Sequence, residues 1–185
     1  MPQRKPPQTE EGLYVSHLML KVRKEARRNP QALSDRADEL VDVLKSAERN
    51  HKFDLARIVS GDADFMTVLF ADTLEELEEF QRQLLNSEAG ADLERVYTFL
   101  SVTELSMYES LEDRVENSLA KEDLEPGDDG YEEARKERRK RLEKYQEMRL
   151  DPDVPDMEYV TFYPMEKRRN PEQNWYQLPQ EERGD

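Results

Sequence analysis

The chain has 185 residues, of which 36% are hydrophobic and 38% are charged, and its formal net charge is −15. This length allows one compact domain with a long appendage or two very small domains, and the few apolar residues predict a modest core. The negative charge argues against a nucleic-acid binder, since phosphate recognition needs clustered Lys and Arg. The absence of cysteine excludes disulfides, thiolate zinc sites, iron–sulfur clusters and cysteine nucleophiles.

The N-terminal region carries no sign of membrane insertion or export. No apolar run of the sequence approaches the roughly 20 residues of a membrane helix, and residues 1–8 lack the apolar region of a signal peptide. We therefore expect a cytoplasmic protein without a membrane span. Residues 1–11 are rich in Pro, Gln and charge and are predicted to be a disordered leader.

The first predicted elements are a strand and a helix. If residues 13–20 form a strand, successive side chains point to opposite faces, and both of these faces are largely apolar. This pattern predicts a strand covered on both sides or buried at a subunit contact. A helix is expected from about Ser34, a candidate N-cap. Its apolar residues recur at helical spacing: Ala37, Leu40, Val41, Leu44 and Ala47.

Three strands and a second helix follow. The strand-like runs 54–59 and 65–71 flank a turn at 60–62, and residues 96–105 form another β-branched and aromatic run. Between them Thr73 opens a helix with a capping-box pattern. The residues expected to face inward in that helix are Leu74, Leu77, Phe80, Leu84 and Leu85.

The resulting order, β-α-β-β-α-β, predicts an α+β fold class with a ferredoxin-like domain over residues 12–108. In that arrangement two helices pack on one face of a four-stranded antiparallel sheet. Because many unrelated functions use this fold, it predicts no chemistry by itself.

Residues 109–148 are predicted to be a charged helical linker, with a short helix, a turn at 125–130 and a longer helix from about Tyr131 to Met148. Apolar residues look too sparse there for a core of their own, so we expect the linker to lie on another part or to remain mobile. The basic run 135–141 is interpreted as a solvated helix face. Its expected i,i+4 partners are Glu132, Glu133 and Glu137.

Residues 158–163, Glu-Tyr-Val-Thr-Phe-Tyr, are predicted to form a strand. No hairpin partner follows it in the sequence, and a lone strand is not stable. The strand is therefore expected to join a sheet supplied by the first domain, by another subunit or by a C-terminal part outside this sequence.

The residues after that strand carry a long motif. YPMEKRR at 163–169, NWYQLP at 174–179 and EER at 181–183 resemble the YPMxKRR…NWYxLPxExR signature of the coproheme decarboxylase branch of the chlorite dismutase-like family. Three further segments are similar to that family's patterns: GLYVSH at 12–17, VTELSMY at 102–108 and RLDPDVP at 149–155.

This resemblance implies two ferredoxin-like halves in tandem, often assembled as pentameric rings, with haem in the C-terminal half. Residues 149–185 would then begin the haem-binding half, which the predicted strand opens as an incomplete second ferredoxin-like sheet. The implied ligand is haem or iron coproporphyrin, with hydrogen peroxide as the co-substrate.

The same resemblance implies roles for four side chains. Tyr163 would be the redox tyrosine, whose radical takes a hydrogen atom from a propionate β-carbon. Lys167, the second catalytic residue, would direct its ammonium at a propionate, and Arg149 would offer the planar fork suited to a carboxylate. Met165 would pack near the porphyrin.

Two departures from the family pattern bear on the iron and on the propionates. The family's proximal histidine follows the ExR run, and this sequence ends at Asp185 before reaching it. His17 is interpreted as structural and His51 as a surface residue, so no metal ligand is assigned. Met107 stands where the family has an Asn able to hydrogen-bond a propionate, and a thioether cannot donate that bond.

We therefore expect a fragment of an enzyme that decarboxylates iron coproporphyrin to haem b with peroxide. A separate chain that supplies the missing half, or a chain that has lost catalysis, would also explain the sequence. The alternatives in function are a non-catalytic, oligomer-forming ferredoxin-like subunit with weak or no porphyrin binding, and chlorite dismutase-type activity. A homo-oligomer is expected in each case, and only the resemblance implies a pentamer.

Overall fold

The computed structural model describes residues 11–59, 61–105, 110–154 and 156–178. The predicted leader lies outside these residues except for its last position, as do the turn residue Ser60, the position of Met107 and the EER run. The chain divides into two compact units. One groups the described residues up to 105 with 146–154, and the other groups 110–145 with 156–178.

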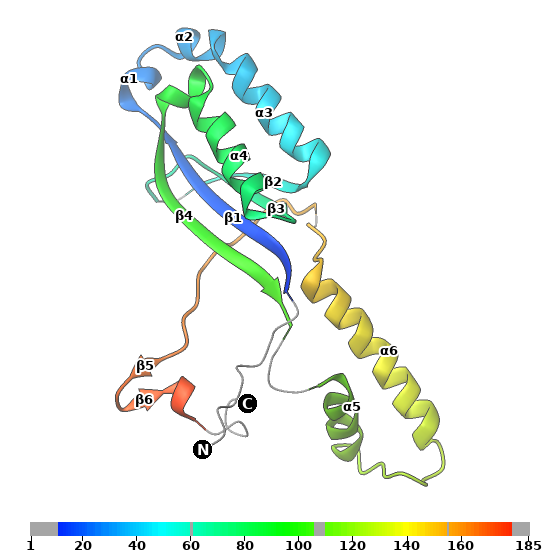
Figure 1. Cartoon of the computed structure of the whole chain (residues 1–185). Coiled ribbons are helices and arrows are strands. Elements are labelled where there is room, and N and C mark those ends of the chain that lie inside the picture. The colour runs from blue at the N-terminus through cyan, green and yellow to red at the C-terminus, as the bar shows by residue number, and fades with distance from the viewer. Residues whose placement is uncertain (1–10, 60, 106–109, 155, 179–185) are drawn as a thin grey trace. The chain divides into compact units, whose positions relative to one another are not determined.

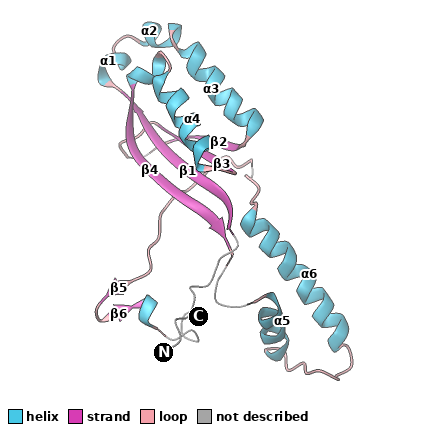
Figure 2. Ribbon diagram, viewed as in Figure 1, coloured by secondary structure: helices cyan, strands magenta, loops and turns pink. Residues whose placement is uncertain are grey.

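The first unit is built on a four-stranded antiparallel sheet with the strand order β2-β3-β1-β4 (Figure 2). Its strands are β1 (Glu11–Val22), β2 (Lys52–Arg57), β3 (Phe65–Ala71) and β4 (Leu93–Glu104). β3 has the predicted bounds, whereas β2 lies slightly earlier than 54–59 and β4 begins before residue 96. The order places the first strand between the third and the last, so the ferredoxin-like prediction is confirmed.

The helices of this unit cover one face of the sheet, with α3 and α4 lying over it in Figure 1. In chain order they are α1 (Lys24–Arg27), α2 (Pro30–Asp35), α3 (Ala37–Asn50), α4 (Leu74–Asn86) and the 3₁₀ turn η1 (Ala89–Asp92). The main core forms between helices and sheet. Its largest buried members are Leu18, Leu20, Leu69, Leu77, Phe80, Leu84 and Leu93.

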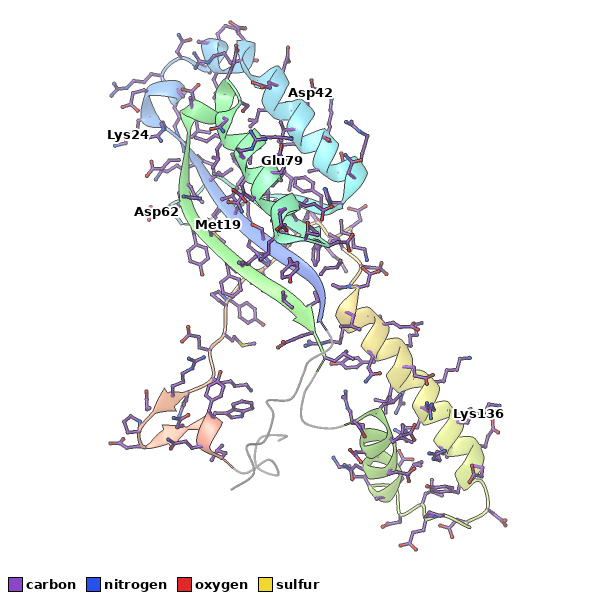
Figure 3. The ribbon with its side chains drawn as sticks, viewed as in Figure 1. Met19, Lys24, Asp42, Asp62, Glu79 and Lys136 are labelled. Carbon is purple, nitrogen blue, oxygen red and sulfur yellow. The ribbon has the colours of Figure 1, made fainter. Side chains whose placement is uncertain are left out.

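β1 is covered on both of its faces, as its double apolar pattern predicted. Leu18 is fully buried on the helix side, and Val15, on the other side, is 4% exposed. The antiparallel register pairs Met19 (labelled in Figure 3) with Met66, and Met66 is buried on the same face as Val15. This strand, apolar on both faces, therefore lies inside the sheet between β3 and β4, and both of its faces are largely shielded from water.

The predicted N-cap of the first long helix is wrong. Ser34 lies inside α2, and α3 begins after Arg36. A helix starts earlier because Asn29 accepts a hydrogen bond from the backbone N–H of Ala32, at 3.2 Å, and because Pro30 occupies the first helical position. Proline is favoured there since its missing N–H would have no helical partner.

α4 begins as predicted. The backbone N–H of Glu76 donates to Thr73 Oγ1 at 3.3 Å, and Glu76 Oε2 accepts from the backbone N–H of Thr73 at 3.0 Å, which completes the capping box. Leu77 and Leu84 are buried, but the inward prediction for Leu74 is wrong, because Leu74 is 46% exposed. At 3.6 residues per turn Leu74 falls on the edge of the stripe centred on those two residues.

In the second unit, α5 (Leu111–Ala120) and the part of α6 (Tyr131–Leu150) that runs up to residue 145 form the predicted helix, turn and helix. The expectation that they have no core of their own is wrong. Val115 and Leu119 are fully buried and Tyr131 is 5% exposed, in a small cluster that the two helices share. A few apolar residues suffice here because Val115 and Leu119 stand one turn apart, on the same face of α5.

The expected partners of the basic run are also wrong. Arg135 donates to Glu112 at 2.8 Å and to Glu116 at 2.9 Å, and Arg139 pairs both with Glu112 and, within α6, with Glu143 at 2.9 Å. The run therefore binds α5 as well as its own helix, and none of these partners is one of the three expected glutamates. The phenol of Tyr131 donates to Glu116 at 2.6 Å.

The predicted strand at 158–163 is not formed, and Figure 2 draws this segment as a loop. Tyr159 is 80% exposed and Val160 50%. A single extended segment gains no ladder hydrogen bonds without a partner strand, and none of the described residues pairs with it. Within the described ranges, no helix combines the length and apolar composition needed to cross a bilayer.

Candidate functional site

The C-terminal motif folds into a small hairpin that holds two cations. β5 (Arg169–Asn170) pairs with β6 (Gln173–Asn174), and the 3₁₀ turn η2 (Trp175–Gln177) follows. The backbone N–H of Trp175 donates to the carbonyl of Arg168 at 2.9 Å. The backbone N–H of Tyr176 donates to Asn174 Oδ1 at 3.0 Å, which closes the turn.

The two aromatic rings of this turn, Trp175 and Tyr176, are each in contact with a cationic side chain. The ammonium of Lys167 lies 4.9 Å from the centre of the Trp175 ring. The guanidinium of Arg169 lies 4.8 Å from the centre of the Tyr176 ring and donates to the Tyr176 hydroxyl at 3.1 Å. Such contacts with a ring face attract a cation without neutralising it. Two positive charges, two residues apart in the sequence, therefore each contact a ring of this turn.

The sequence singled out Lys167 but not Arg169, although both belong to the quoted motif. The signal that identifies Arg169 is its spacing, since residues i and i+2 of an extended segment project to the same side. Trp175 and Tyr176 belong to the NWYQLP part of the motif, and in the structure they contact these two cations directly.

Tyr163 and Met165 lie before the hairpin, in the segment without regular structure. Their side chains are 65% and 82% exposed, respectively. An exposed phenol and an exposed thioether beside a cationic hairpin offer apolar surface next to positive charge. A flat apolar ligand with carboxylates matches that combination.

Arg149 belongs to the other compact unit, at the end of α6. Its guanidinium is exposed and donates to the backbone carbonyl of Glu104 at 3.3 Å. The next residues are tied to the sheet, because Thr103 Oγ1 donates to the carbonyl of Leu150 at 2.5 Å and Lys52 Nζ lies 2.5 Å from Asp151 Oδ1. The convergence of Arg149 with Tyr163 and Lys167 stays a prediction.

The two histidines have different settings. His17 is partly buried on the sheet, and its ring meets that of Phe99 edge-on at 6.1 Å between centroids. Burial lowers the pKa of His17 below its ordinary value of 6.5, while a hydrogen bond with the backbone of Phe99 acts in the opposite direction. His51 is the residue that ends α3.

No group of three or more His, Cys, Asp or Glu residues that could hold a metal ion occurs among the residues that the structure describes. Two grooves in this part of the chain border α3. One is lined by α3 and α4 around Val43 and Phe80, and the other by α3 and β2 around Leu44 and Phe53. Neither groove includes a predicted site residue.

Comparison with known proteins gives consistent matches. The sequence profile of a family described as chlorite dismutase matches residues 33–185. A "putative heme-binding protein" of Haloarcula marismortui is 36% identical over an alignment of 190 residues that covers 99% of this chain and 26% of that protein. The coproheme decarboxylase of Oceanobacillus iheyensis is 27% identical over 155 residues, which are 83% of this chain and 53% of that protein.

A solved structure described as a novel heme-binding protein from Thermus thermophilus superposes with a TM-score of 0.69 and 28% identity. The match covers 98% of this chain and 66% of that one. The chain therefore spans 26% of the Haloarcula relative and about half of the decarboxylase.

Proposed function

This chain belongs to the chlorite dismutase family, as its motifs predicted, and we therefore propose that it binds an iron porphyrin through the porphyrin carboxylates. We further propose that it takes part in the peroxide-dependent oxidative decarboxylation of iron coproporphyrin to haem b. Because the chain spans only part of its relatives, this activity is proposed for the protein to which the chain contributes.

One observation carries the proposal. In a chain with 43 acidic and 28 basic residues, Lys167 and Arg169 are held by aromatic rings. Among the described residues neither cation forms an ion pair with a carboxylate. Their charge thus stays available for an anion, and a propionate is an anion that a lysine and an arginine both bind well.

The residues present fit the carboxylate side of an iron porphyrin. Lys167 and Arg169 would hold one carboxylate group, Arg149 would offer its fork to another, and Met165 would contact the apolar macrocycle. When bound, the iron porphyrin supplies both the propionates that are lost and the redox-active metal. No residue of this chain is assigned as the iron ligand.

Tyr163 is the proposed redox residue. Its phenol gives up one electron and one proton, and the resulting radical takes a hydrogen atom from the β-carbon of a propionate. The carboxylate then leaves as carbon dioxide as a second electron is removed, and a vinyl group remains. Per propionate, one hydrogen peroxide takes up these two electrons, the proton released by the phenol and one proton from solution, and becomes two waters. Lys167 would hold the propionate carboxylate in place until the bond breaks.

The first prediction concerns Tyr163. In the protein expressed from its complete reading frame, Tyr163→Phe should abolish the conversion of iron coproporphyrin by peroxide, because phenylalanine cannot form the radical. Mass spectrometry of the extracted porphyrin measures the loss of carbon dioxide, and the absorbance titration should show unchanged porphyrin binding. Tyr159→Phe is the matched control, since Tyr159 is also exposed and lies on the same segment.

Undiminished conversion by Tyr163→Phe, or no conversion by the unaltered protein, would contradict the assignment. The alternative is a subunit that binds porphyrin weakly and does not catalyse, and Met107 favours it, since a thioether cannot donate the hydrogen bond that the family's Asn offers a propionate. An absorbance band typical of five-coordinate, histidine-ligated iron in the 185-residue chain alone would count against the alternative. Assaying chlorite decomposition in parallel tests the other activity of the family.

A further inference from the structure

We propose that Thr103 and Lys52 are positioning residues, which fix the end of α6 so that Arg149 can meet a porphyrin carboxylate. The inference rests on the proposed function for the identity of the ligand. It goes beyond that function because it gives β4 and β2, which contribute no residue to the predicted site, a role in porphyrin binding. All the contacts that carry it lie within one compact unit.

Thr103 links the end of α6 to two strands at once. Its hydroxyl donates to the carbonyl of Leu150 at 2.5 Å and accepts from the backbone N–H of Leu13 at 2.7 Å. The last carbonyls of any helix lack partners within the helix, so a side-chain donor satisfies one of them. Thr103 belongs to β4 and Leu13 to β1, and the hydroxyl therefore ties three segments together.

Gly12 makes this approach possible. A Cβ atom at position 12 would lie 2.2 Å from the carbonyl oxygen of Leu150 and 2.4 Å from Thr103 Oγ1. Both distances are far shorter than any van der Waals contact, and the first involves backbone that cannot simply swing aside. Only glycine leaves room here, so Gly12 is required for steric reasons rather than for backbone freedom.

Lys52 holds the residues that follow. From the start of β2 its ammonium pairs with Asp151 Oδ1 at 2.5 Å and donates to the carbonyl of Pro152 at 3.1 Å. Its side chain is 32% exposed, so these contacts are partly shielded from water. The backbone is thus fixed at Leu150 by β4 and at 151–152 by β2.

Arg149 sits directly before this fixed segment. Its guanidinium donates to the carbonyl of Glu104, the residue next to Thr103, so β4 contacts both Arg149 and Leu150. A long arginine side chain loses conformational freedom when it binds, and a fixed starting point reduces that loss. The geometry therefore links Gly12, Lys52 and Thr103 to the direction in which Arg149 extends.

The test uses the full chain and free-base coproporphyrin, whose fluorescence reports binding without any iron ligand. Thr103→Val keeps the shape of the side chain but removes the hydroxyl, and it should weaken binding roughly three- to tenfold. Thr103→Ser, which retains the hydroxyl, should restore binding. The tetramethyl ester of the same porphyrin carries no carboxylate, so its binding should not change.

Two further measurements separate positioning from a general effect on the fold. In an Arg149→Gln background, Thr103→Val should have no additional effect on coproporphyrin binding, since coupled residues are not additive. Lys52→Met should repeat the selective loss from a different strand, and Lys45→Met, an exposed lysine on α3, is its control.

The outcomes separate the two proposals. Equal losses for the acid and the ester, or additive losses with Arg149→Gln, would overturn the positioning role and leave porphyrin binding intact. Unchanged affinity in both Thr103→Val and Lys52→Met would do the same. An unaltered chain that fails to bind coproporphyrin would overturn the proposed function, and the positioning role with it.

Discussion

At the scale of single residues, the cations of the candidate site differ in what holds them. Arg149 contacts a backbone carbonyl, whereas Lys167 and Arg169 contact aromatic rings. None of these partners carries a formal charge, so each cation can attract a carboxylate at close range. By contrast, Arg82 and Arg135 already pair with glutamates and have far less attraction left for a further anion.

Several residues of the proposed site are predicted from the sequence alone, whereas the residues proposed to position Arg149 are not. Tyr163, Met165 and Lys167 lie within one short motif, so the sequence alone shows that they are close to one another along the chain. Thr103 reaches Leu150 across 47 positions and Lys52 reaches Asp151 across 99. Periodicity reports only on neighbours within a turn or a strand, and such long-range hydrogen bonds become visible only once the sheet has formed.

His17 gives a prediction for pH. Burial lowers its pKa in the folded chain, so between pH 6.5 and that lower value the unfolded chain binds more protons. The contribution of His17 to the free energy of unfolding should therefore be fully present above about pH 6.5, and it should be lost as the pH falls through this window. Urea unfolding from about pH 7.5 to about pH 5 measures it.

The matched variants for this prediction are His17→Gln and His51→Gln. The first should flatten the dependence on pH in that window, because glutamine does not titrate. The second should leave the contribution of His17 in place. A slope that persists in His17→Gln would assign the pH dependence to other groups.

At the scale of elements, apolar periodicity worked where each element packs against a neighbour close in sequence. β3 and the start of α4 appear at the predicted residues because a strand with turns at both ends and a capping box are local signals. Residues 158–163 have the composition of a strand, yet they form none, since a strand depends on a partner that composition does not reveal. Ser34 failed as a cap because Asn29 and Pro30 start a helix before it.

The pairing of α5 and α6 is the clearest case of a misjudged element. Its composition is dominated by charge, and its core rests on few side chains, with Leu119 and Val115 fully buried. Exposed ion pairs contribute at most about 1 kcal/mol each, whereas a fully buried leucine contributes about 1.5–3 kcal/mol. We therefore infer that the cluster, rather than the network of arginines and glutamates, holds the two helices together.

Leu119→Ala tests that inference. It should lower the free energy of unfolding of the helix pair by about 2–5 kcal/mol, the usual effect of truncating a buried leucine. Hydrogen exchange should speed up at the amides of α5 and of the first part of α6 but not in β1 and β3. Met148→Ala is the control, because Met148 is 59% exposed. Faster exchange after Arg139→Gln than after Leu119→Ala would show that the ion pairs dominate instead.

At the scale of the whole molecule, the dominant property is the excess of 43 acidic over 28 basic residues. Salt acts on this charge in two opposing ways. It screens the repulsion among the excess carboxylates, which stabilises the compact chain, and it weakens the attractive ion pairs. Most of those pairs, including Arg82 with Glu79 and Arg139 with Glu143, have substantially exposed side chains.

The balance of these effects predicts that added salt stabilises the chain. Exposed pairs contribute little and are short-range, whereas a net charge of −15 acts over the Debye length, which shrinks from about 30 Å at 0.01 M to about 3 Å at 1 M salt. The midpoint of thermal unfolding should therefore rise with NaCl, most steeply below about 0.15 M, where screening changes fastest. Sucrose at matched osmolarity stabilises by exclusion without screening, so it should lack this steep initial rise. A midpoint that falls with NaCl would mean that the local pairs outweigh the excess charge, and the acidic composition would then need an explanation other than screening.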